Sequence, residues 1–247
     1  MSNSIWIGTA GGAGALRALD VAANNLANSQ TTGFKSDRAI FSVERVQASP
    51  GEEISESSVM AATASRVNYV ATDFSEGTTI PTDSPTDFAV EGEGFFHLLD
   101  EASGKEFLTR DGSFQLDNEG RLVTRDGLFV LGENGQKLSV AGSSLEVGPR
   151  GRVLVDGAAR GTIALKDVAD RAALSKVGGT RFEVAGELVA GSGNVAQGRL
   201  ESSNVEPVGA LVELIALQRY YEAFQKSARA ADSMDEQLAT RVGRKND

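Results

Sequence analysis

Residues 23–28 read ANNLAN and residues 29–35 read SQTTGFK, so three uncharged amides close an apolar, helix-like segment. This segment begins near Ser4, and its apolar residues follow the 3-4-3 spacing of a heptad-like stripe. The spacing predicts a helix over residues 4–28. The residues of the stripe are Leu16, Leu19, Ala23 and Leu26.

A second row of small residues runs along the same helix at every fourth position. Small side chains allow the backbone of another helix to approach closely. Glycines in a helix interior each cost about 1 kcal/mol relative to alanine, so we expect this helix to need a partner before it is stable. The row consists of Ala10, Gly14, Ala18 and Ala22.

The asparagines at the end of this helix have two interpretations. Asn24 and Asn28 are four residues apart, and Asn25 and Asn28 are three apart, so each pair shares a helix face. Amides at an interhelical seam form hydrogen bonds only in the correct register and therefore favour one alignment. Alternatively, Asn28 ends the helix while Asn24 and Asn25 face water. Beyond it, we expect Gly33 to adopt a positive φ and Phe34 to anchor the chain.

The longest helical pattern in the sequence covers residues 207–242. Pro207 suits the first turn of a helix, whereas Ser203 followed by Glu206 suits a capping box. These two starting points differ by a few residues, and the sequence leaves both open. An apolar stripe with 3-4 spacing runs along the pattern: Leu211, Leu214, Leu217, Tyr221, Phe224, Ala228, Ala231 and Leu238.

Residues 87–198 have the pattern of a compact, mostly antiparallel β domain. Apolar runs at 88–90 and 95–99 flank residues 91–94 and predict a hairpin. The tetrapeptide Thr-Arg-Asp-Gly occurs at 109–112 and again at 124–127, and Asp-Gly turns between alternating apolar residues are a strong hairpin signal. Further strands are expected at residues 138–140, 153–155, 161–165 and 181–184.

The fold class predicted from these patterns is α+β. Amino- and carboxy-terminal α-helices pair as a coiled-coil-like core, and the antiparallel β domain lies between them in the sequence. Residues 41–86 are polar, with a short strand expected over 66–74. The predicted domains are a discontinuous helical domain (1–40 plus 200–247), an extended linker (41–86) and a β domain (87–199).

The composition limits the classes of function. The chain has 247 residues, a formal net charge of -10 and a pI near 4.8. This charge disfavours nucleic acid or an anionic membrane as the main partner, because phosphates would be repelled. The absence of cysteine excludes disulfides and thiolate sites. The amino-terminal segment lacks the basic region of a cleaved signal peptide, and no apolar run is long enough to span a bilayer.

The sequence offers no convincing catalytic, cofactor or metal site. His97, the single histidine, lies in an apolar strand pattern and is expected to be buried. Residues 115–126 vaguely resemble a calcium loop but lack its first acidic ligand and its closing glutamate. The Gly-Gly-Ala-Gly run at 11–14 follows no predicted strand and lacks the lysine of a phosphate-binding loop. We therefore predict a protein without enzymatic activity, cofactor, metal or small-molecule substrate.

Apolar stripes at both ends of the chain predict that the two terminal helices pair. Tyr220, Tyr221 and Phe224 would then face the small-residue row. We expect further copies of the chain to cover the apolar area that the pair leaves exposed, with some residues ordering only on assembly. An ordinary helical layer over the β domain is the alternative. The predicted assembly interface comprises Leu16, Leu19, Ala23, Asn24, Asn25, Leu26, Asn28, Gly33, Phe34, Asn204, Leu211, Leu214, Leu217, Tyr221, Phe224, Ala228, Ala231 and Leu238.

Motifs along nearly the whole chain resemble those of the bacterial flagellar rod and hook proteins. The amino-terminal motif covers residues 23–35, and the carboxy-terminal motif runs from LESSNV at 200–205 into LQRYYE at 217–222. Residues 87–96 and 108–114 resemble the β domain of the same family. Chain length and residues 79–88 are most similar to the proximal-rod members, followed by the distal-rod members. The glycine-rich residues 11–14 and the residues 219–221 depart from the family pattern.

The resemblance implies a structural role in which subunits stack helically, with terminal helices inside and β domains outside. They would form the axial drive shaft of the flagellar basal body, in the periplasmic space. The implied partners are copies of the chain, earlier proximal-rod subunits, the distal-rod protein and the flagellar type III export apparatus, which would export the chain unfolded and without a cleaved signal peptide. Three other functions stay open: a hook subunit of the same family, a β domain that binds carbohydrate or peptide, and a hydrolase using an acidic pair such as Asp111 and Asp126.

Overall fold

The computed structural model describes the backbone of residues 3–42 and 66–243, and the side chains of residues 12–40, 69–230 and 233. The chain divides into two compact units. Unit 1 comprises residues 1–27, 37–73 and 206–247, and unit 2 comprises residues 28–36 and 74–205. The described part of the chain is mostly antiparallel β structure with one long α-helix near each end, so the fold class is α+β.

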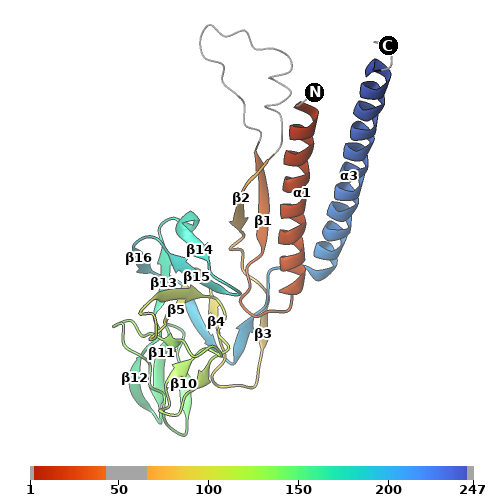
Figure 1. Ribbon diagram of the computed structural model, residues 1–247. Coiled ribbons are helices and arrows are strands. Elements are labelled where there is room, and N and C mark those ends of the chain that lie inside the picture. Colours follow the sequence, from red (N-terminus) through yellow and green to blue (C-terminus); the bar gives the residue numbers. More distant parts are fainter. Residues whose placement is uncertain (1–2, 43–65, 244–247) are drawn as a thin grey trace. The chain divides into compact units, whose positions relative to one another are not determined.

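Unit 1 contains both long helices. Helices α1 (Asn3–Ala27) and α3 (Pro207–Gly243) lie side by side and contact each other, and strands β1 (Asp37–Ser42) and β2 (Arg66–Thr72) form an antiparallel ribbon against α1 (Figure 1). The two terminal helices predicted from the sequence are confirmed, and so is a strand within residues 66–74. The ribbon has a register shift between Ile40 and Phe41.

The start of α3 settles the choice that the sequence left open. Pro207 is the first helical residue, where its missing backbone N–H costs nothing. The hydroxyl of Ser203 instead accepts a hydrogen bond from the backbone N–H of Val205, at 3.2 Å. The capping box predicted at Ser203 and Glu206 is therefore wrong, because Ser203 stabilises a turn that precedes the helix.

Unit 2 is built from sixteen of the described strands and one short 3-10 helix, η1 (Arg171–Ala173). Its largest sheet has nine strands and includes the path β14-β15-β6-β5-β9-β8-β7. A three-stranded sheet β10-β11-β12 and the pairs β17-β4 and β18-β3 complete the unit. The strands are β3 (Thr79–Pro81), β4 (Phe88–Glu91), β5 (Phe95–Leu99), β6 (Glu106–Thr109), β7 (Gln115–Leu116), β8 (Leu122–Val123), β9 (Phe129–Val130), β10 (Leu145–Val147), β11 (Arg152–Val155), β12 (Ala158–Thr162), β13 (Leu165–Val168), β14 (Leu174–Lys176), β15 (Arg181–Val184), β16 (Leu188–Ala190), β17 (Asn194–Gln197) and β18 (Arg199–Glu201).

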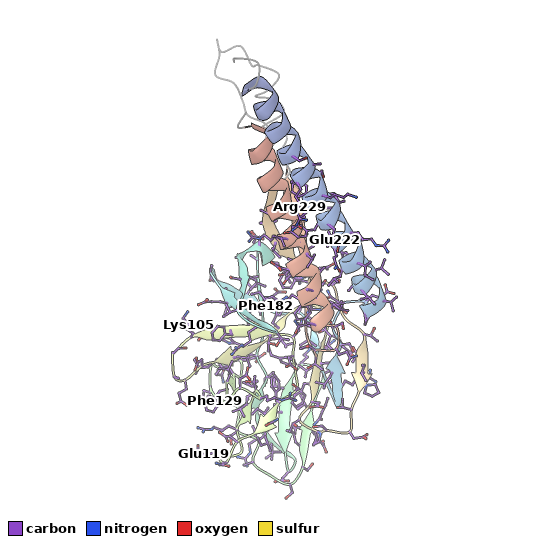
Figure 2. The ribbon with its side chains drawn as sticks, turned by 45° about the vertical axis from the view of Figure 1, so that its right-hand side comes forward. Lys105, Glu119, Phe129, Phe182, Glu222 and Arg229 are labelled. Atoms are coloured by element: carbon purple, nitrogen blue, oxygen red, sulfur yellow. The ribbon has the colours of Figure 1, made fainter. Side chains whose placement is uncertain are left out.

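Alternate residues of β5 serve two hydrophobic cores, as the period of two along a strand requires. Phe96 and Leu98 belong to the larger core, whereas Phe95 packs with Leu108 and Phe182 in the smaller one. Phe182 lies inside the sheet region, while Lys105 and Glu119 extend from its surface (Figure 2). The β domain thus has a core of its own, as its sequence pattern predicted.

Of the three predicted hairpins, the one at residues 124–127 forms, and those at 91–94 and 109–112 do not. The turns at residues 117–120 and 124–127 connect the antiparallel pairs β7-β8 and β8-β9. The hairpin predicted across residues 91–94 is wrong, because β4 pairs with β17, some hundred residues later, rather than with β5. The turn at 111–112 leads from β6, which pairs with β5 and β15, to β7, which pairs with β8, so it closes no hairpin either.

Candidate functional site

The small residues of α1 form its buried face within unit 1. Ala15, Ala18 and Ala22 are each at most 5% exposed. At Gly12, an added Cβ would lie 2.9 Å from the Phe224 ring of α3, which is too close for any side chain without movement of the ring. The two helices therefore approach closely at Gly12, which at 3.6 residues per turn shares a face of α1 with Leu16 and Leu19. Gly14, Ala18 and Ala22 are buried as well, but they lie on another side of α1, so the contact of this row with α3 stays a prediction.

The leucine stripe of α1 is covered less completely than the small-residue row. Leu16 is 43% exposed, and Leu19, Ala23 and Leu26 are half-buried. Contacts to α3 and to the β1-β2 ribbon thus leave part of this stripe open to solvent.

Helix α3 carries two apolar faces. The first consists of half-buried side chains with the 3-4 spacing predicted from the sequence, namely Leu214, Leu217, Tyr221, Phe224 and Ala228. The second is exposed and consists of Val208, Leu211, Val212 and Ile215, with Val212 61% exposed. At 3.6 residues per turn, Val212 and Leu214 are separated by about 200° around the helix, so the two faces are nearly opposite.

Tyr220 and Leu211 of α3 are exposed, although the sequence predicted that both belong to the packed side of the helix. Tyr220 is 61% exposed, so the prediction that it faces α1 is wrong, whereas Tyr221 is half-buried and Phe224 contacts Gly12. Leu211 belongs to the exposed face. Charged residues such as Glu222 and Arg229 extend from α3 into solvent (Figure 2). The side chains of Ala231 and Leu238 lie outside the described part of the structure.

The three asparagines of the opening motif have different environments. Asn25 is buried, donates from Nδ2 to the backbone oxygen of Asp37 at 2.7 Å, and accepts from the backbone N–H of Asp37 at 2.9 Å. Its amide therefore fastens the start of β1 to α1 instead of forming the expected interhelical bond. Asn24 is exposed on α1, and Asn28 follows the last helical residue and accepts from the Thr31 hydroxyl.

Downstream of α1, two segments far apart in sequence run beside each other in unit 2. The backbone N–H of Gly33 donates to the backbone oxygen of Glu201 at 2.8 Å, and the backbone N–H of Asn204 donates to the backbone oxygen of Phe34 at 3.4 Å. Gly33 has φ +67°, and an added Cβ would overlap the backbone nitrogen of Asp111. Phe34 is 1% exposed, with Lys176 Nζ 3.9 Å from its ring centre. The predictions for the positive φ of Gly33 and the anchoring of Phe34 are confirmed.

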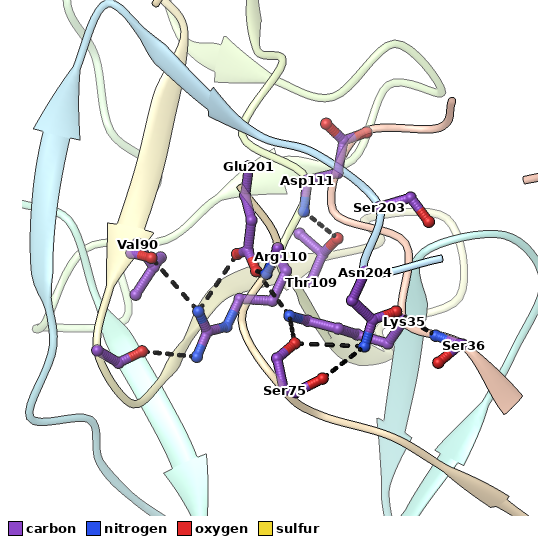
Figure 3. Close-up of polar contacts among 12 residues, drawn as sticks. Lys35, Ser36, Ser75, Val90, Thr109, Arg110, Asp111, Glu201, Ser203 and Asn204 are labelled. Carbon is purple, nitrogen blue, oxygen red and sulfur yellow. Dashed lines mark hydrogen bonds and ion pairs between the residues drawn. The ribbon is translucent and has the colours of Figure 1, made fainter. Parts of the chain in front are cut away.

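Asn204 joins three segments of unit 2 through its side chain. Its Oδ1 accepts from the backbone N–H of Ser36 at 2.7 Å, and its Nδ2 donates to the Ser75 hydroxyl at 3.1 Å (Figure 3). Unit 2 ends at residue 36 and begins again at residue 74. The Asn204 amide therefore connects two segments of unit 2 that are within two residues of these boundaries.

The segments at residues 33–36, 75–77 and 201–204 form a junction within unit 2, and a buried cluster of three charged side chains lies against it. Lys35 Nζ donates to Glu201 Oε1 and to the Ser75 backbone oxygen, both at 2.6 Å, while Arg110 donates to Glu201 Oε2 at 3.3 Å (Figure 3). The backbone N–H of Gly77 donates to the same carboxylate at 2.9 Å. Lys35 is 1% exposed, and Arg110 and Glu201 are 2% exposed. One carboxylate thus serves two buried cations.

The environment of the cluster opposes the charge that it contains. Burial lowers the pKa of Lys35 below its usual 10.5, and the hydrogen bond and ion pair with Glu201 act in the opposite direction. Arg110 also donates to the backbone oxygens of Val90 and Gly92, and its guanidinium lies 5.1 Å from the Phe95 ring centre. Backbone acceptors therefore share the task of holding the two cations.

The sequence pattern does not reveal Lys35, Arg110 and Glu201 as a site. Lys35 and Glu201 lie inside the two terminal motifs, but nothing local to a lysine or a glutamate indicates that it is buried. The repeat at 109–112 and 124–127 would even suggest equivalent arginines, yet Arg125 is exposed while Arg110 is buried. Their partners lie up to 166 residues away, so the cluster exists only in the tertiary structure.

The remaining polar residues considered from the sequence have structural partners. His97 is buried, as predicted, with Nε2 2.9 Å from Glu106 Oε2. Asp117 accepts from the backbone N–H groups of Glu119 and Arg121 and from the Arg121 side chain, which lowers the pKa of its carboxyl group. Within residues 3–42 and 66–243, no cluster of three or more metal-ligating side chains occurs. In the same residues, no helix is both long and apolar enough to cross a bilayer.

One polar cavity brings the two copies of the repeat together. It has a volume of about 410 Å³, and both Asp111 and Asp126 line it, together with Thr32 and Arg181. The Asp111 carboxylate accepts from the hydroxyls of Thr32 and Ser113, both at 2.8 Å. In the geometry shown, this aspartate stabilises the turn after β6 and holds the amino-terminal segment.

Three family models match the chain, in the same order as the motifs. The model described as "Flagella basal body rod protein" matches residues 10–35, and the "Flagellar hook protein FlgE/F/G D1 domain" matches residues 89–155. The model "Flagellar basal body rod FlgEFG protein C-terminal" matches residues 196–241. Together they cover α1 from residue 10 onward with residues 28–35, much of the β domain, and most of α3.

Individual relatives agree with the family models. The flagellar basal-body rod protein FlgF of Caulobacter vibrioides is 33% identical over 253 positions, covering 100% of both chains. The rod protein FlgG of Buchnera aphidicola subsp. Schizaphis graminum is 30% identical, covering 97% of this chain and 99% of its own. The hook protein FlgE of Helicobacter mustelae is 38% identical over 152 positions, but these cover 56% of this chain and 34% of its own.

The full-length match to a rod protein and the ordered family segments leave one conclusion. This chain belongs to the family of flagellar basal-body rod and hook proteins, which are structural proteins and not enzymes.

Proposed function

We propose that this chain is a structural subunit of the proximal rod of the flagellar basal body. The full-length similarity to a FlgF rod protein supports a rod subunit of this type, whereas the hook relative matches only part of the chain. In this proposal, the subunits assemble helically with copies of the chain and with other rod proteins, and the assembly transmits torque. Similarity to FlgG over nearly the full length makes a distal-rod subunit the second candidate.

The observation that carries the assembly proposal is the exposed apolar face of α3. Val208, Leu211, Val212 and Ile215 recur at intervals of three and four residues, so they form one continuous stripe on the helix. Since the opposite face already packs within unit 1, α3 can bind its own α1 and a neighbouring subunit at the same time. A stripe of this kind on a monomer is characteristic of an interaction surface.

In the assembled rod, we propose that α1 and α3 pair as a coiled-coil-like core. The axial-core domain comprises residues 1–40 and 200–247, residues 41–86 form the linker region, and residues 87–199 form the outer β domain. The interface includes the leucine stripe of α1, the predicted residues of α3, and Asn24, Asn28 and Asn204 near the helix ends. Knobs-into-holes packing suits the half-buried 3-4 stripe of α3 and the face of α1 that carries Gly12 and the leucine stripe.

The proposed location is the periplasmic part of the basal body, reached through the flagellar type III export apparatus without a cleaved signal peptide. The small-residue face of α1 supports export in unfolded form, because a helix that buries mostly alanine and glycine gains little stability before its partner arrives.

The test substitutes the exposed face of α3. We expect Val212→Gln/Ile215→Gln to leave the far-UV circular dichroism of the monomer unchanged but to abolish swimming when it replaces the native protein, with the variant missing from isolated basal bodies. The control Glu213→Gln/Gln218→Ala alters exposed polar residues of the same helix turns and should swim normally. Normal incorporation of Val212→Gln/Ile215→Gln would refute the assembly role of this face.

A further inference from the structure

The buried charge cluster lies within unit 2, close in sequence to the residues at which the chain continues into unit 1. The chain crosses from one unit to the other after residues 27, 36, 73 and 205. The side chain of Asn204 bonds Ser36 and Ser75. These three residues each lie within two residues of one of the crossings after 36, 73 and 205. Lys35 directly precedes Ser36 in the chain, and its Nζ donates both to Glu201 and to the backbone oxygen of Ser75. The connections of unit 2 to β1, β2 and α3 are therefore gathered at one point.

The chemistry of the cluster demands a single arrangement of these segments. Glu201 uses Oε1 for Lys35 and Gly77 and uses Oε2 for Arg110, so both carboxylate oxygens are occupied. Sliding either terminal segment by one residue would separate at least one nearly fully buried charge from its partner. Apolar contacts tolerate such a shift, whereas an unpaired buried charge does not.

The net stability supplied by the cluster is a poor explanation for its presence. Buried ion clusters are often replaceable by apolar residues without loss of stability, because burial penalises each charge. The burial that lowers the pKa of Lys35 is a sign of the same penalty. What the cluster supplies is directional hydrogen bonding among Lys35, Arg110 and Glu201, on three separate segments of the chain.

We propose that Lys35, Arg110 and Glu201 are positioning residues that fix the register of the amino-terminal segment 33–36 against the carboxy-terminal segment 201–204. This lock, formed by the three side chains, fixes the positions within unit 2 from which the chain continues into β1 and α3. This role rests on the proposed rod function for its biological purpose, but the register itself is a property of a single chain and is measurable there.

The variants Glu201→Gln and Lys35→Met test the lock at different strengths. Glu201→Gln leaves two buried cations without a carboxylate, whereas Lys35→Met leaves the pair of Glu201 with Arg110 intact. The matched control is the surface pair Lys105 and Glu183, at 2.7 Å, whose side chains are more than a third exposed. Lys105→Met and Glu183→Gln remove the same chemical groups from a solvated position.

The first readout is amide hydrogen exchange in the isolated protein. The amides of Gly33 and Asn204 donate across the two terminal segments, and those of Leu108 and Phe182 report on the sheet. We expect Glu201→Gln to accelerate exchange at Gly33 and Asn204 at least tenfold, with Lys35→Met giving a smaller effect in the same direction. The sheet amides should change less than twofold, and the control variants should change neither pair.

The second readout is the distance between spin labels at Gln30→Cys and Glu119→Cys, both at exposed sites of unit 2 in a chain without native cysteine. Glu201→Gln should broaden this distance distribution. If the terminal and sheet amides accelerate together, or if the distribution stays narrow, the cluster has only a general structural role and the proposal is overturned. If Glu201→Gln fails to fold, Lys35→Met decides by the same two measurements.

Swimming assays separate this proposal from the proposed function. A variant with a loosened junction should swim poorly although the exposed face of α3 is intact. Normal swimming by such a variant would overturn the positioning role while leaving the rod function in place. Conversely, Val212→Gln/Ile215→Gln should leave both junction readouts unchanged, and normal incorporation of that variant would count against the assembly face and not against the lock.

Discussion

Replacing Gly33 with alanine measures how much the close approach at the terminal junction matters to unit 2. Gly33 has φ +67°, and a Cβ at this position would overlap backbone atoms of Arg110 and Asp111, which cannot rotate away as a side chain could. Gly104 is a matched control, because its φ is +69° and an added Cβ meets nothing within 4 Å. The two substitutions share the conformational cost and differ in the overlap.

The expected magnitudes follow from these two geometries. Alanine in the left-handed region costs about 1–2 kcal/mol, and this is the whole effect expected for Gly104→Ala. At Gly33, the amino-terminal segment must also retreat from Asp111, which breaks the hydrogen bond from Gly33 to Glu201 and costs about 1 kcal/mol more. Disturbing the bond from Thr32 to Asp111 and the buried cluster brings the expected loss for Gly33→Ala to about 4 kcal/mol.

Native-state hydrogen exchange gives these free energies for unit 2 without assuming that both units unfold together. Strands β5 and β6 form the centre of the large sheet, so their slowest amides report on unfolding of the unit. We expect Gly33→Ala to lower the free energy of unfolding by at least about 2 kcal/mol more than Gly104→Ala does, because only Gly33→Ala adds a backbone overlap to the conformational cost. Equal losses of stability in the two variants would show that the amino-terminal segment moves away from Asp111 at little cost, and would refute the predicted effect of the overlap.

Two further predictions concern the charge cluster and α3. Because burial lowers the pKa of Lys35 in the folded chain below 10.5, the unfolded chain binds more protons at this site between the two pKa values, and the site's contribution to stability rises with pH there. Urea unfolding should therefore show the stability of the native chain relative to Lys35→Met increasing as the pH approaches 10.5; a constant or falling difference would contradict the assigned burial. In the first turn of α3, a Cβ at Gly209 would contact only the flexible side chain of Glu206, at 3.2 Å or more, so Gly209→Ala should stabilise the helix by about 1 kcal/mol. When both proteins are warmed, far-UV circular dichroism should show that Gly209→Ala retains more helix than the native chain. Unchanged or reduced helicity would indicate that this position needs glycine.

The Thr-Arg-Asp-Gly repeat illustrates how similar sequence acquires different structure. At 124–127, the turn joins β8 to β9 as an ordinary hairpin, and Arg125 is exposed. At 109–112, an added Cβ on Gly112 would overlap the backbone oxygen of Phe88, and the Gly112 oxygen accepts from the Phe88 N–H at 3.0 Å. The first copy is therefore packed against β4, and its arginine points to Glu201. Local turn chemistry is the same in both copies, so only the neighbouring segments distinguish them.

The terminal helices show the same division between local and distant causes. The 3-4 spacing of α1 and α3 predicted both helices to within a residue or two, because helix formation depends on residues three and four apart. The spacing did not distinguish Tyr220 from Tyr221, nor did it reveal that Leu211 lies on an exposed face. Those outcomes depend on where α1 contacts α3, as it does where Gly12 meets the ring of Phe224, and Gly12 belongs to a distant segment of the chain.

Local sequence patterns were sufficient to predict the two helices, the β character of the central region, the turn at Gly33 and the family of flagellar rod and hook proteins. Each of these is carried by residues adjacent in the chain or spaced by a helix turn or a strand period. Three features became visible only in the folded chain: Asn25 bonds the start of β1, β4 pairs with β17, and Lys35 and Arg110 share the carboxylate of Glu201. Burial of a charge and pairing of distant strands depend on contacts across up to 166 residues, and the local pattern of a sequence does not contain them.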